Sequence, residues 1–216
     1  LHQRLKQRYP DVPLCIMGHS MGSFLTRTYL IRYPGTVKAA VIMGTGWQPQ
    51  AAITGGLALA NAIAAVSGEN ATSELVTELA FGSYNKLFAP NRTKVDWLSA
   101  DESNVDDYIA DPLCGADATV GLFRQMLHGI RFNQRQSHLR QMDREMPVLF
   151  VAGDKDPVGS CGKGVRQTYD AFRAAGMRDC TLKLYPGLRH EILNEKAYTA
   201  DITKNIEAWL LSRLEK

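Results

Sequence analysis

Hydrophobic residues are distributed along the chain in short continuous runs, which alternate with longer segments where they recur at helical spacing. The short runs are rich in aliphatic and β-branched residues, which is typical of strands buried on both faces of a sheet. These runs span residues 13–17, 39–43, 148–152 and 181–185. Helical patterns cover residues 23–32, 164–175 and 198–214. The alternation predicts an α/β fold with a mostly parallel sheet and helices on both faces.

Residues 47–146 interrupt this alternation, because they contain helical and loop patterns but no convincing strand between two predicted strands. A long helical segment at such a position is expected to be an insertion that lies outside the sheet. We therefore predict a core formed by residues 1–46 and 147–216, with residues 47–146 as a helical cap, or lid.

The start of the predicted cap, residues 51–66, is strongly apolar. It is shorter than the roughly 20 residues that a membrane-spanning helix needs, and it includes Thr54 and Asn61. Two interpretations are open at this stage. The segment is either a helix buried within the cap or a lid surface that receives an acyl chain or touches lipid.

The composition is that of an ordinary globular protein: of 216 residues, 45% are hydrophobic and 22% are charged, and the net charge is +3. Lysine and arginine are scattered along the chain, which argues against nucleic acid as a partner. The cysteines are far apart in the sequence and suggest neither a metal site nor a disulfide framework, so we expect a reducing, cytoplasmic location.

The motif GHSMG at residues 18–22 lies between a predicted strand and a predicted helix. A serine at such a position sits on a sharp strand-to-helix turn with its hydroxyl exposed above the sheet edge, and small residues at 18 and 22 let strand and helix approach. Ser20 is therefore the candidate nucleophile. The N–H of Met21, at the start of the helix, is the candidate donor to the oxyanion that would form on a substrate carbonyl.

A serine hydroxyl needs a base to remove its proton, and His190 is the best candidate because it lies in a loop just after the last predicted strand. His19 adjoins Ser20 in the sequence, so its side chain is poorly placed to reach the hydroxyl. His2, His128 and His138 lie in helix-like or cap segments.

The acid that orients the base is expected on another loop at the same end of the sheet. The segment after the predicted strand at 148–152 offers Asp154 and Asp156, and either could instead be a turn-forming aspartate beside Gly153 or Pro157. The resulting order of serine, acid and histidine distinguishes one lineage of serine triads from the others.

In these three motifs the sequence resembles the α/β-hydrolase superfamily, and within it the group of monoacylglycerol lipases and lysophospholipases that also includes serine aminopeptidase-like hydrolases. The resemblance rests on GHSMGSF at 18–24, PVLFVAGDKDPVG at 147–159 and YPGLRHEILNE at 185–195. In that group the acid is the aspartate three places after the glycine, which here is Asp156. The resemblance also implies that the cap shapes an acyl pocket.

Members of this group have further strands before the serine turn, and one is followed by a loop that supplies a second oxyanion N–H. The sequence begins without these strands, with a polar helix-like segment and no initiator Met, so we expect it to be the C-terminal part of a longer enzyme. Loss of one oxyanion donor typically lowers the rate by about 10²–10³-fold. The strand at 13–17 would also present an unpaired edge.

The sequence thus predicts a serine hydrolase that cleaves carboxylic esters through an acyl-enzyme, with monoacylglycerol or lysophospholipid esters as the first choice of substrate. Small carboxylesters and aminoacyl peptide bonds are alternatives, as is a hydrolase-like protein that binds a ligand without turnover. We expect no metal or organic cofactor. The expected partners are a small acyl ester and, transiently through the cap, a membrane surface.

Overall fold

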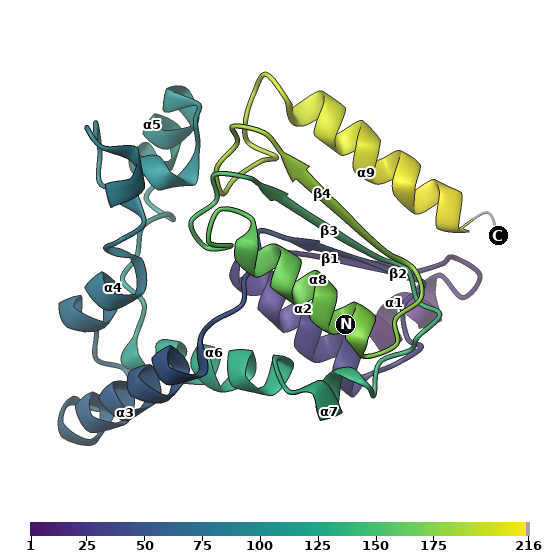
Figure 1. Cartoon of the computed structure of the whole chain (residues 1–216), viewed down its shortest axis with the longest axis horizontal. Helices are drawn as coiled ribbons and strands as arrows, with labels where there is room; N and C mark the ends of the chain where they lie inside the picture. The colour runs from purple at the N-terminus through teal and green to yellow at the C-terminus, as the bar shows by residue number, and fades with distance from the viewer. Residues whose placement is uncertain (215–216) are drawn as a thin grey trace.

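The computed structural model describes residues 1–214 and contains a parallel sheet with the strand order β1-β2-β3-β4 (Figure 1). The strands are β1 (Cys15–His19), β2 (Ala39–Met43), β3 (Val148–Gly153) and β4 (Cys180–Tyr185). The helices of the sheet region are α1 (His2–Arg8), α2 (Met21–Arg32), α8 (Lys163–Ala174) and α9 (Thr199–Leu214).

Successive residues of the central strands alternate between two hydrophobic cores, as the pleat of a strand requires. Ala40, Ile42 and Phe150 face the core that α2 and α8 cover. Val41 and Leu149 belong to the opposite core, against α9. Both faces of the middle strands are therefore buried, and this explains why β2 and β3 are continuous apolar runs.

The predicted strands and sheet-region helices are confirmed, with small shifts at their ends. β1 begins at Cys15 because Pro13 has no N–H to donate to the ladder, and it continues to His19. It is an edge strand in this sheet, and Met17 is 53% exposed because α9 packs over β2 and β3.

Residues 47–146 form helices joined by loops. Their first part lies beyond the carboxyl ends of the strands, and their last part runs back alongside α2 and α8 toward the amino ends (Figure 1). These elements are α3 (Gln50–Ser67), α4 (Glu74–Phe81), α5 (Glu102–Ala110), α6 (Val120–Asn133), α7 (Gln136–Leu139) and the 3₁₀ helices η1 (Asn85–Phe88) and η2 (Asp96–Leu98). A separate hydrophobic cluster joins α3 and α6 to Phe24 of α2. We refer to residues 47–146 as the cap segment.

Helix α3 is less buried than the first of the two interpretations, a helix buried within the cap, would require. Only Ile53, Leu57 and Ala60 are buried in it, so the interpretation of a helix buried within the cap is wrong for most of its surface. Apolar composition does not determine how many neighbours a helix has, and α3 packs mainly against α6. By length and composition alone α3 could also cross a membrane, since it has 18 residues and a mean hydropathy of 1.3.

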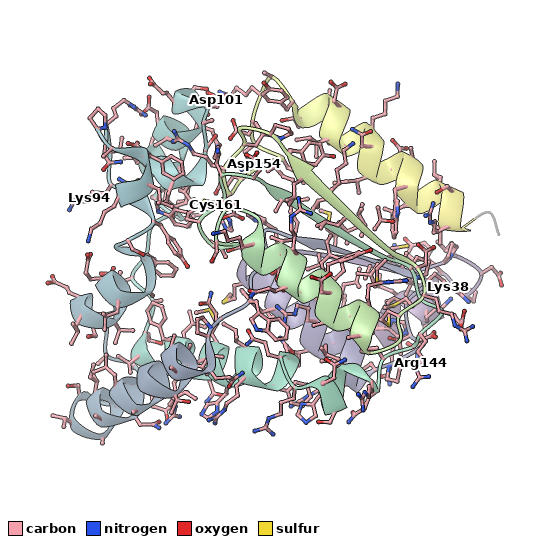
Figure 2. The ribbon with its side chains drawn as sticks, viewed as in Figure 1. Lys38, Lys94, Asp101, Arg144, Asp154 and Cys161 are labelled. Carbon is pink, nitrogen blue, oxygen red and sulfur yellow. The ribbon has the colours of Figure 1, made fainter. Side chains whose placement is uncertain are left out.

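The two ends of the sheet differ in what surrounds them. Lys38 and Arg144 lie near the amino ends of the strands, whereas Asp154 and Cys161 lie in the loops beyond β3, at the end that faces α4 and α5 (Figure 2). In open α/β sheets, ligands bind outside the carboxyl ends of the strands. This end of the molecule is therefore where a functional site is expected.

Candidate active site

Ser20 occupies the turn between β1 and α2 with a backbone φ of 55°, a value that non-glycine residues seldom adopt. Its N–H donates to the carbonyl oxygen of Met43 at 3.1 Å, and its own carbonyl accepts from the amide and hydroxyl of Ser23. These bonds hold the residue in a strained conformation, as is common for functional residues. Met21 is the first residue of α2, so its N–H has no partner within the helix.

The two glycines of the motif have different roles. A Cβ on Gly18 would lie 2.2 Å from the carbonyl oxygen of Gly22, so only glycine allows β1 and α2 to approach this closely. A Cβ on Gly22 would meet nothing within 4 Å. The expectation that both positions must be small is therefore correct for Gly18 and wrong for Gly22.

His190 and Asp156 form a buried pair. The Nδ1 of His190 lies 3.0 Å from each carboxylate oxygen of Asp156, and the two side chains are 3% and 0% exposed. One of these oxygens also accepts from the Val158 N–H at 2.9 Å. Because Nδ1–H donates to the carboxylate, the neutral ring has its lone pair on Nε2. The hydrogen bonds among residues 1–214 include none between this ring and Ser20, and such bonds often form only with substrate bound.

His19 contacts His190 directly, a role that was not predicted from the sequence. Its Nε2–H donates to the His190 carbonyl oxygen at 3.0 Å, and the two ring centroids are 4.6 Å apart. Burial, together with the neighbouring charge of His190, lowers the pKa of His19. A neutral His19 supports the backbone of the histidine loop without adding a second positive charge beside it.

Arg27 stabilises the turn that follows β2. Its side chain is fully buried, and Nη1 donates to the carbonyl oxygen of Gly46 at 2.9 Å and to the Thr45 hydroxyl at 3.3 Å. Its Nε and Nη2 have no hydrogen-bond partner among the described residues, and burial lowers the pKa of the group to about 9. A Cβ on Gly46 would lie 2.3 Å from the Val158 carbonyl oxygen, so this turn packs closely on the acid loop.

A cavity of about 540 Å³ opens next to Ser20, between α2 and the cap segment. Its volume is in the usual range of small-molecule sites. The lining is mostly apolar and comes largely from α2, α3, α4 and α6. It includes Phe24, Leu59, Leu122, Phe123 and Met126.

Two aromatic residues of the cap segment, Trp97 and Tyr84, line this cavity near His190. The Trp97 ring is 5.2 Å from the His190 ring and 5.2 Å from the Tyr84 ring. Burial, with a contribution from the charge of Asp156, raises the pKa of Tyr84 to about 12, so its phenol stays protonated. No sequence motif points to either residue as part of the site, because their positions depend on how the cap segment folds back to the sheet.

The structure therefore brings Asp156 and His190 together and places Ser20 and Met21 on the wall of the adjacent cavity. Asp154, the alternative acid, has a different partner: its carboxylate accepts from the Gly187 N–H at 2.8 Å.

The family is decided by a comparison with protein-family models. The model described as serine aminopeptidase, S33, matches residues 1–197, which include the Ser20 turn and the Asp156 and His190 loops. This chain belongs to that family. The predicted α/β-hydrolase superfamily is thus confirmed, and so is the fold class.

Relatives of this S33 family member include lipases. The chain is 31% identical over 211 residues to a monoacylglycerol lipase of Mycolicibacterium smegmatis, covering 95% of this chain and 65% of the relative. It is 26% identical over 217 residues to the monoglyceride lipase of Mus musculus, covering 97% of this chain and 62% of the relative. The chain thus spans somewhat less than two thirds of the length of these relatives.

The same fold occurs in solved structures. A thermostable carboxyl esterase from Bacillus coagulans, solved in complex with glycerol, superposes with a TM-score of 0.90 at 24% identity. The superposition covers 98% of this chain and 68% of the esterase chain. At this level of identity the likeness establishes the α/β-hydrolase fold alone.

Proposed function

We propose that the protein is a serine hydrolase that cleaves carboxylic esters, with Ser20 as nucleophile, His190 as general base and Asp156 as the acid that orients the base. The main support is the buried His190–Asp156 pair at the same end of the sheet as a serine held at positive φ. A histidine oriented by a carboxylate is the arrangement that activates a serine hydroxyl. The names of the relatives favour an ester as substrate.

In the proposed reaction, Nε2 of His190 removes the hydroxyl proton of Ser20 while Oγ attacks the ester carbonyl carbon. The Met21 N–H donates to the oxyanion of the tetrahedral intermediate. His190 then donates its proton to the alcohol oxygen, the C–O bond breaks, and the acyl group stays on Ser20. Water, deprotonated by the same histidine, hydrolyses this acyl-enzyme and releases the carboxylic acid. The reaction uses no metal or organic cofactor.

The proposed substrates are esters with a long acyl chain, of the monoacylglycerol or lysophospholipid type. The apolar lining of the cavity beside Ser20 favours an acyl chain. Small carboxylesters and aminoacyl peptide bonds are the alternatives within this fold. The described residues that line the cavity include no aspartate or glutamate, so none of them would pair with the protonated amino group of an aminopeptidase substrate.

The cap segment also supports the proposal that the protein transiently contacts a membrane surface. Helix α3 contains no charged residue, and Val66 at its end is 89% exposed. Leu75 and Leu79 of α4 are 55% and 67% exposed. Exposed apolar groups of this kind can bury into the boundary between lipid headgroups and acyl chains. A cytoplasmic location stays a prediction.

The direct test is labelling with a fluorophosphonate, which reacts with activated serines, followed by mass spectrometry of the modified peptide. We expect one modified site, Ser20, and no labelling of the Ser20→Ala variant. Circular dichroism should show that both proteins are folded.

A folded wild-type protein that takes up no label would contradict the hydrolase proposal. Tight ligand binding that survives Ser20→Ala would then favour the alternative of a hydrolase-like binding protein. Labelling confined to Ser20 would justify a comparison of glycerol esters, lysophospholipids and aminoacyl amides as substrates.

A further inference from the structure

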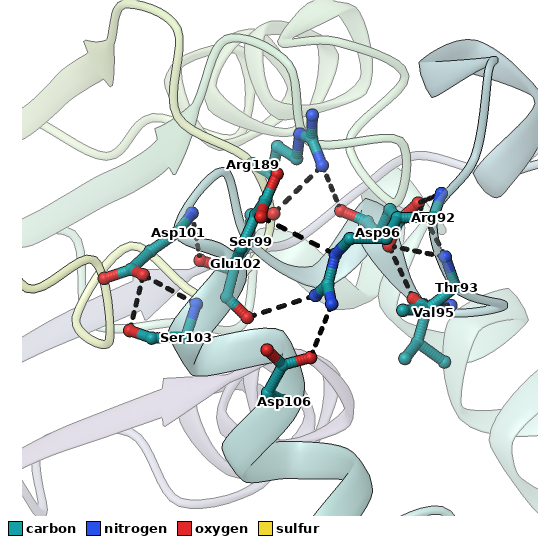
Figure 3. Close-up of polar contacts among 10 residues, drawn as sticks. All are labelled: Arg92, Thr93, Val95, Asp96, Ser99, Asp101, Glu102, Ser103, Asp106 and Arg189. Carbon is teal, nitrogen blue, oxygen red and sulfur yellow. Dashed lines mark hydrogen bonds and ion pairs between the residues drawn. The ribbon is translucent and has the colours of Figure 1, made fainter.

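Residues 92–104 of the cap segment, which we call the strap, are bound to the loop that contains His190. Arg189 donates through Nη1 to the carbonyl oxygens of Asp96 and Ser99, the second at 2.9 Å (Figure 3). The Glu191 N–H donates to the carbonyl oxygen of Leu98 at 2.8 Å. The two neighbours of His190 in the sequence therefore both bind the strap.

A buried carboxylate adds to the attachment. Glu195 is 3% exposed, and its two oxygens accept from the backbone N–H groups of Ala100 and Asp101, at 2.8 and 3.1 Å. Hydrogen bonds to a buried charged group are among the stronger ones in proteins. The strap and the histidine loop are thus joined at several successive residues.

The position of Arg189 has a consequence for Trp97. The two carbonyl oxygens that it binds, those of Asp96 and Ser99, lie on either side of Trp97 in the sequence. Trp97 in turn lines the cavity and lies 5.2 Å, ring to ring, from His190. The Arg189 guanidinium also stacks over the Phe88 ring at 4.0 Å, which fixes its orientation.

We propose that Arg189 is a positioning residue, which holds Trp97 against His190 and so aligns an ester bound in the cavity with the base. The proposal rests on the proposed function. Removing the guanidinium would break the two hydrogen bonds on either side of Trp97 and so loosen this turn, although the rest of the strap stays attached. The His190–Asp156 pair would keep its own hydrogen bonds. A small misplacement of a positioning group can lower the rate considerably.

Arg92 provides a matched control, because it is an arginine at the start of the same strap. Its guanidinium donates to the Asp106 carboxylate at 2.7 Å and to the Glu102 carbonyl oxygen at 3.2 Å (Figure 3). It belongs to an exposed network and has no hydrogen bond to the histidine loop among the described residues. Losing it should leave Trp97 in place.

The test is a double-mutant cycle with Arg189→Met, Arg92→Met and Trp97→Leu, measured as kcat/KM with p-nitrophenyl decanoate. We expect Arg189→Met to lower kcat/KM by about tenfold or more when Trp97 is present, the scale expected for a lost charge-assisted hydrogen bond. In the Trp97→Leu background the loss should shrink to about threefold or less, since coupled residues are not additive. Arg92→Met should change kcat/KM by less than about threefold in both backgrounds.

Tryptophan fluorescence gives a second readout that needs no activity. We expect Arg189→Met to shift the emission maximum to longer wavelength, and the shift should vanish in the Trp97→Leu background. Arg189→Lys, which keeps one donor, should be intermediate in both assays and serves if Arg189→Met fails to fold. Equal losses of kcat/KM in both backgrounds, or an unchanged Trp97 emission, would overturn the proposal. If the wild-type protein hydrolyses no ester while Arg189→Met still shifts the emission of Trp97, the proposed function is refuted and the positioning of Trp97 by Arg189 stands.

Discussion

Asp154 and Asp156 stand two residues apart in one loop, yet they have different environments. Asp156 is fully buried and bonds through both carboxylate oxygens to His190. Asp154 is partly exposed and accepts from the Gly187 N–H, which stabilises the turn after β4. The sequence offered either aspartate as the acid, and the choice of Asp156 rested partly on the family resemblance.

If Asp156 orients His190, an amide in its place should be strongly damaging. Asp156→Asn keeps the shape but favours the wrong tautomer of His190, so we expect kcat for an ester to fall by about 10³–10⁴-fold. Asp154→Asn is the control and should lower kcat by less than about threefold. The amide oxygen of asparagine can still accept from the Gly187 N–H, and this bond is separate from the His190–Asp156 pair. Similar losses for both variants in steady-state kinetics would contradict the assignment.

At the residue scale, motif and resemblance together were enough to select Ser20, Asp156 and His190 as candidates. Their catalytic roles stay predictions until they are measured. The contacts of His19 and Trp97 with His190 could not be predicted, because they join positions far apart in the sequence. No periodicity or turn signal specifies which side chain of the cap segment returns to the histidine loop.

At the scale of elements, the close crossing of β1 and α2 depends on Gly18, whose side chain is a single hydrogen atom. A Cβ at Gly18 would lie 2.2 Å from a backbone oxygen and 2.3 Å from the Thr26 hydroxyl oxygen. A backbone oxygen cannot move aside without displacing α2, so an added methyl group must separate strand and helix.

We therefore expect Gly18→Ala to lower the free energy of unfolding by roughly 1–3 kcal/mol, the usual effect of overpacking. Gly22→Ala, four residues away, adds the same methyl group where nothing lies within 4 Å. It should leave stability unchanged or raise it by up to about 1 kcal/mol, since alanine favours the helix. Urea unfolding of both variants measures the difference, and an equal loss of stability would show that the crossing is not tight.

The pattern of apolar runs was sufficient to predict the strands and the helices of the sheet region. It works because both faces of β2 and β3 are covered, which makes a buried strand visible as a continuous run. The same reasoning fails for α3, in which only Ile53, Leu57 and Ala60 are buried. Its burial depends on the neighbours that the cap segment provides, and these are not encoded in the composition of the helix itself.

At the scale of the whole molecule, the cavity exists because α3, α4 and α6 of the cap segment enclose the space beside Ser20 and α2. Helix α3 forms one wall. Ala60 is buried and lines the cavity, whereas Ala58, two residues earlier in the same helix, is exposed and is not part of the lining. The same substitution can therefore narrow the cavity at Ala60 and leave it unchanged at Ala58.

Filling this cavity should change which esters are cleaved. If the acyl chain occupies the cavity, Ala60→Phe should lower kcat/KM for a decanoyl ester by about tenfold or more. The reason is that several methylene groups of the chain lose their place in the cavity, and burial of each contributes about 0.8 kcal/mol. For an acetyl ester, which lacks these groups, kcat/KM should change by less than about threefold. Ala58→Phe should leave both values near those of the wild type. If Ala60→Phe reduces both esters equally while thermal unfolding shows an intact fold, the chain is bound elsewhere, and the argument that links the cap segment to long acyl chains fails.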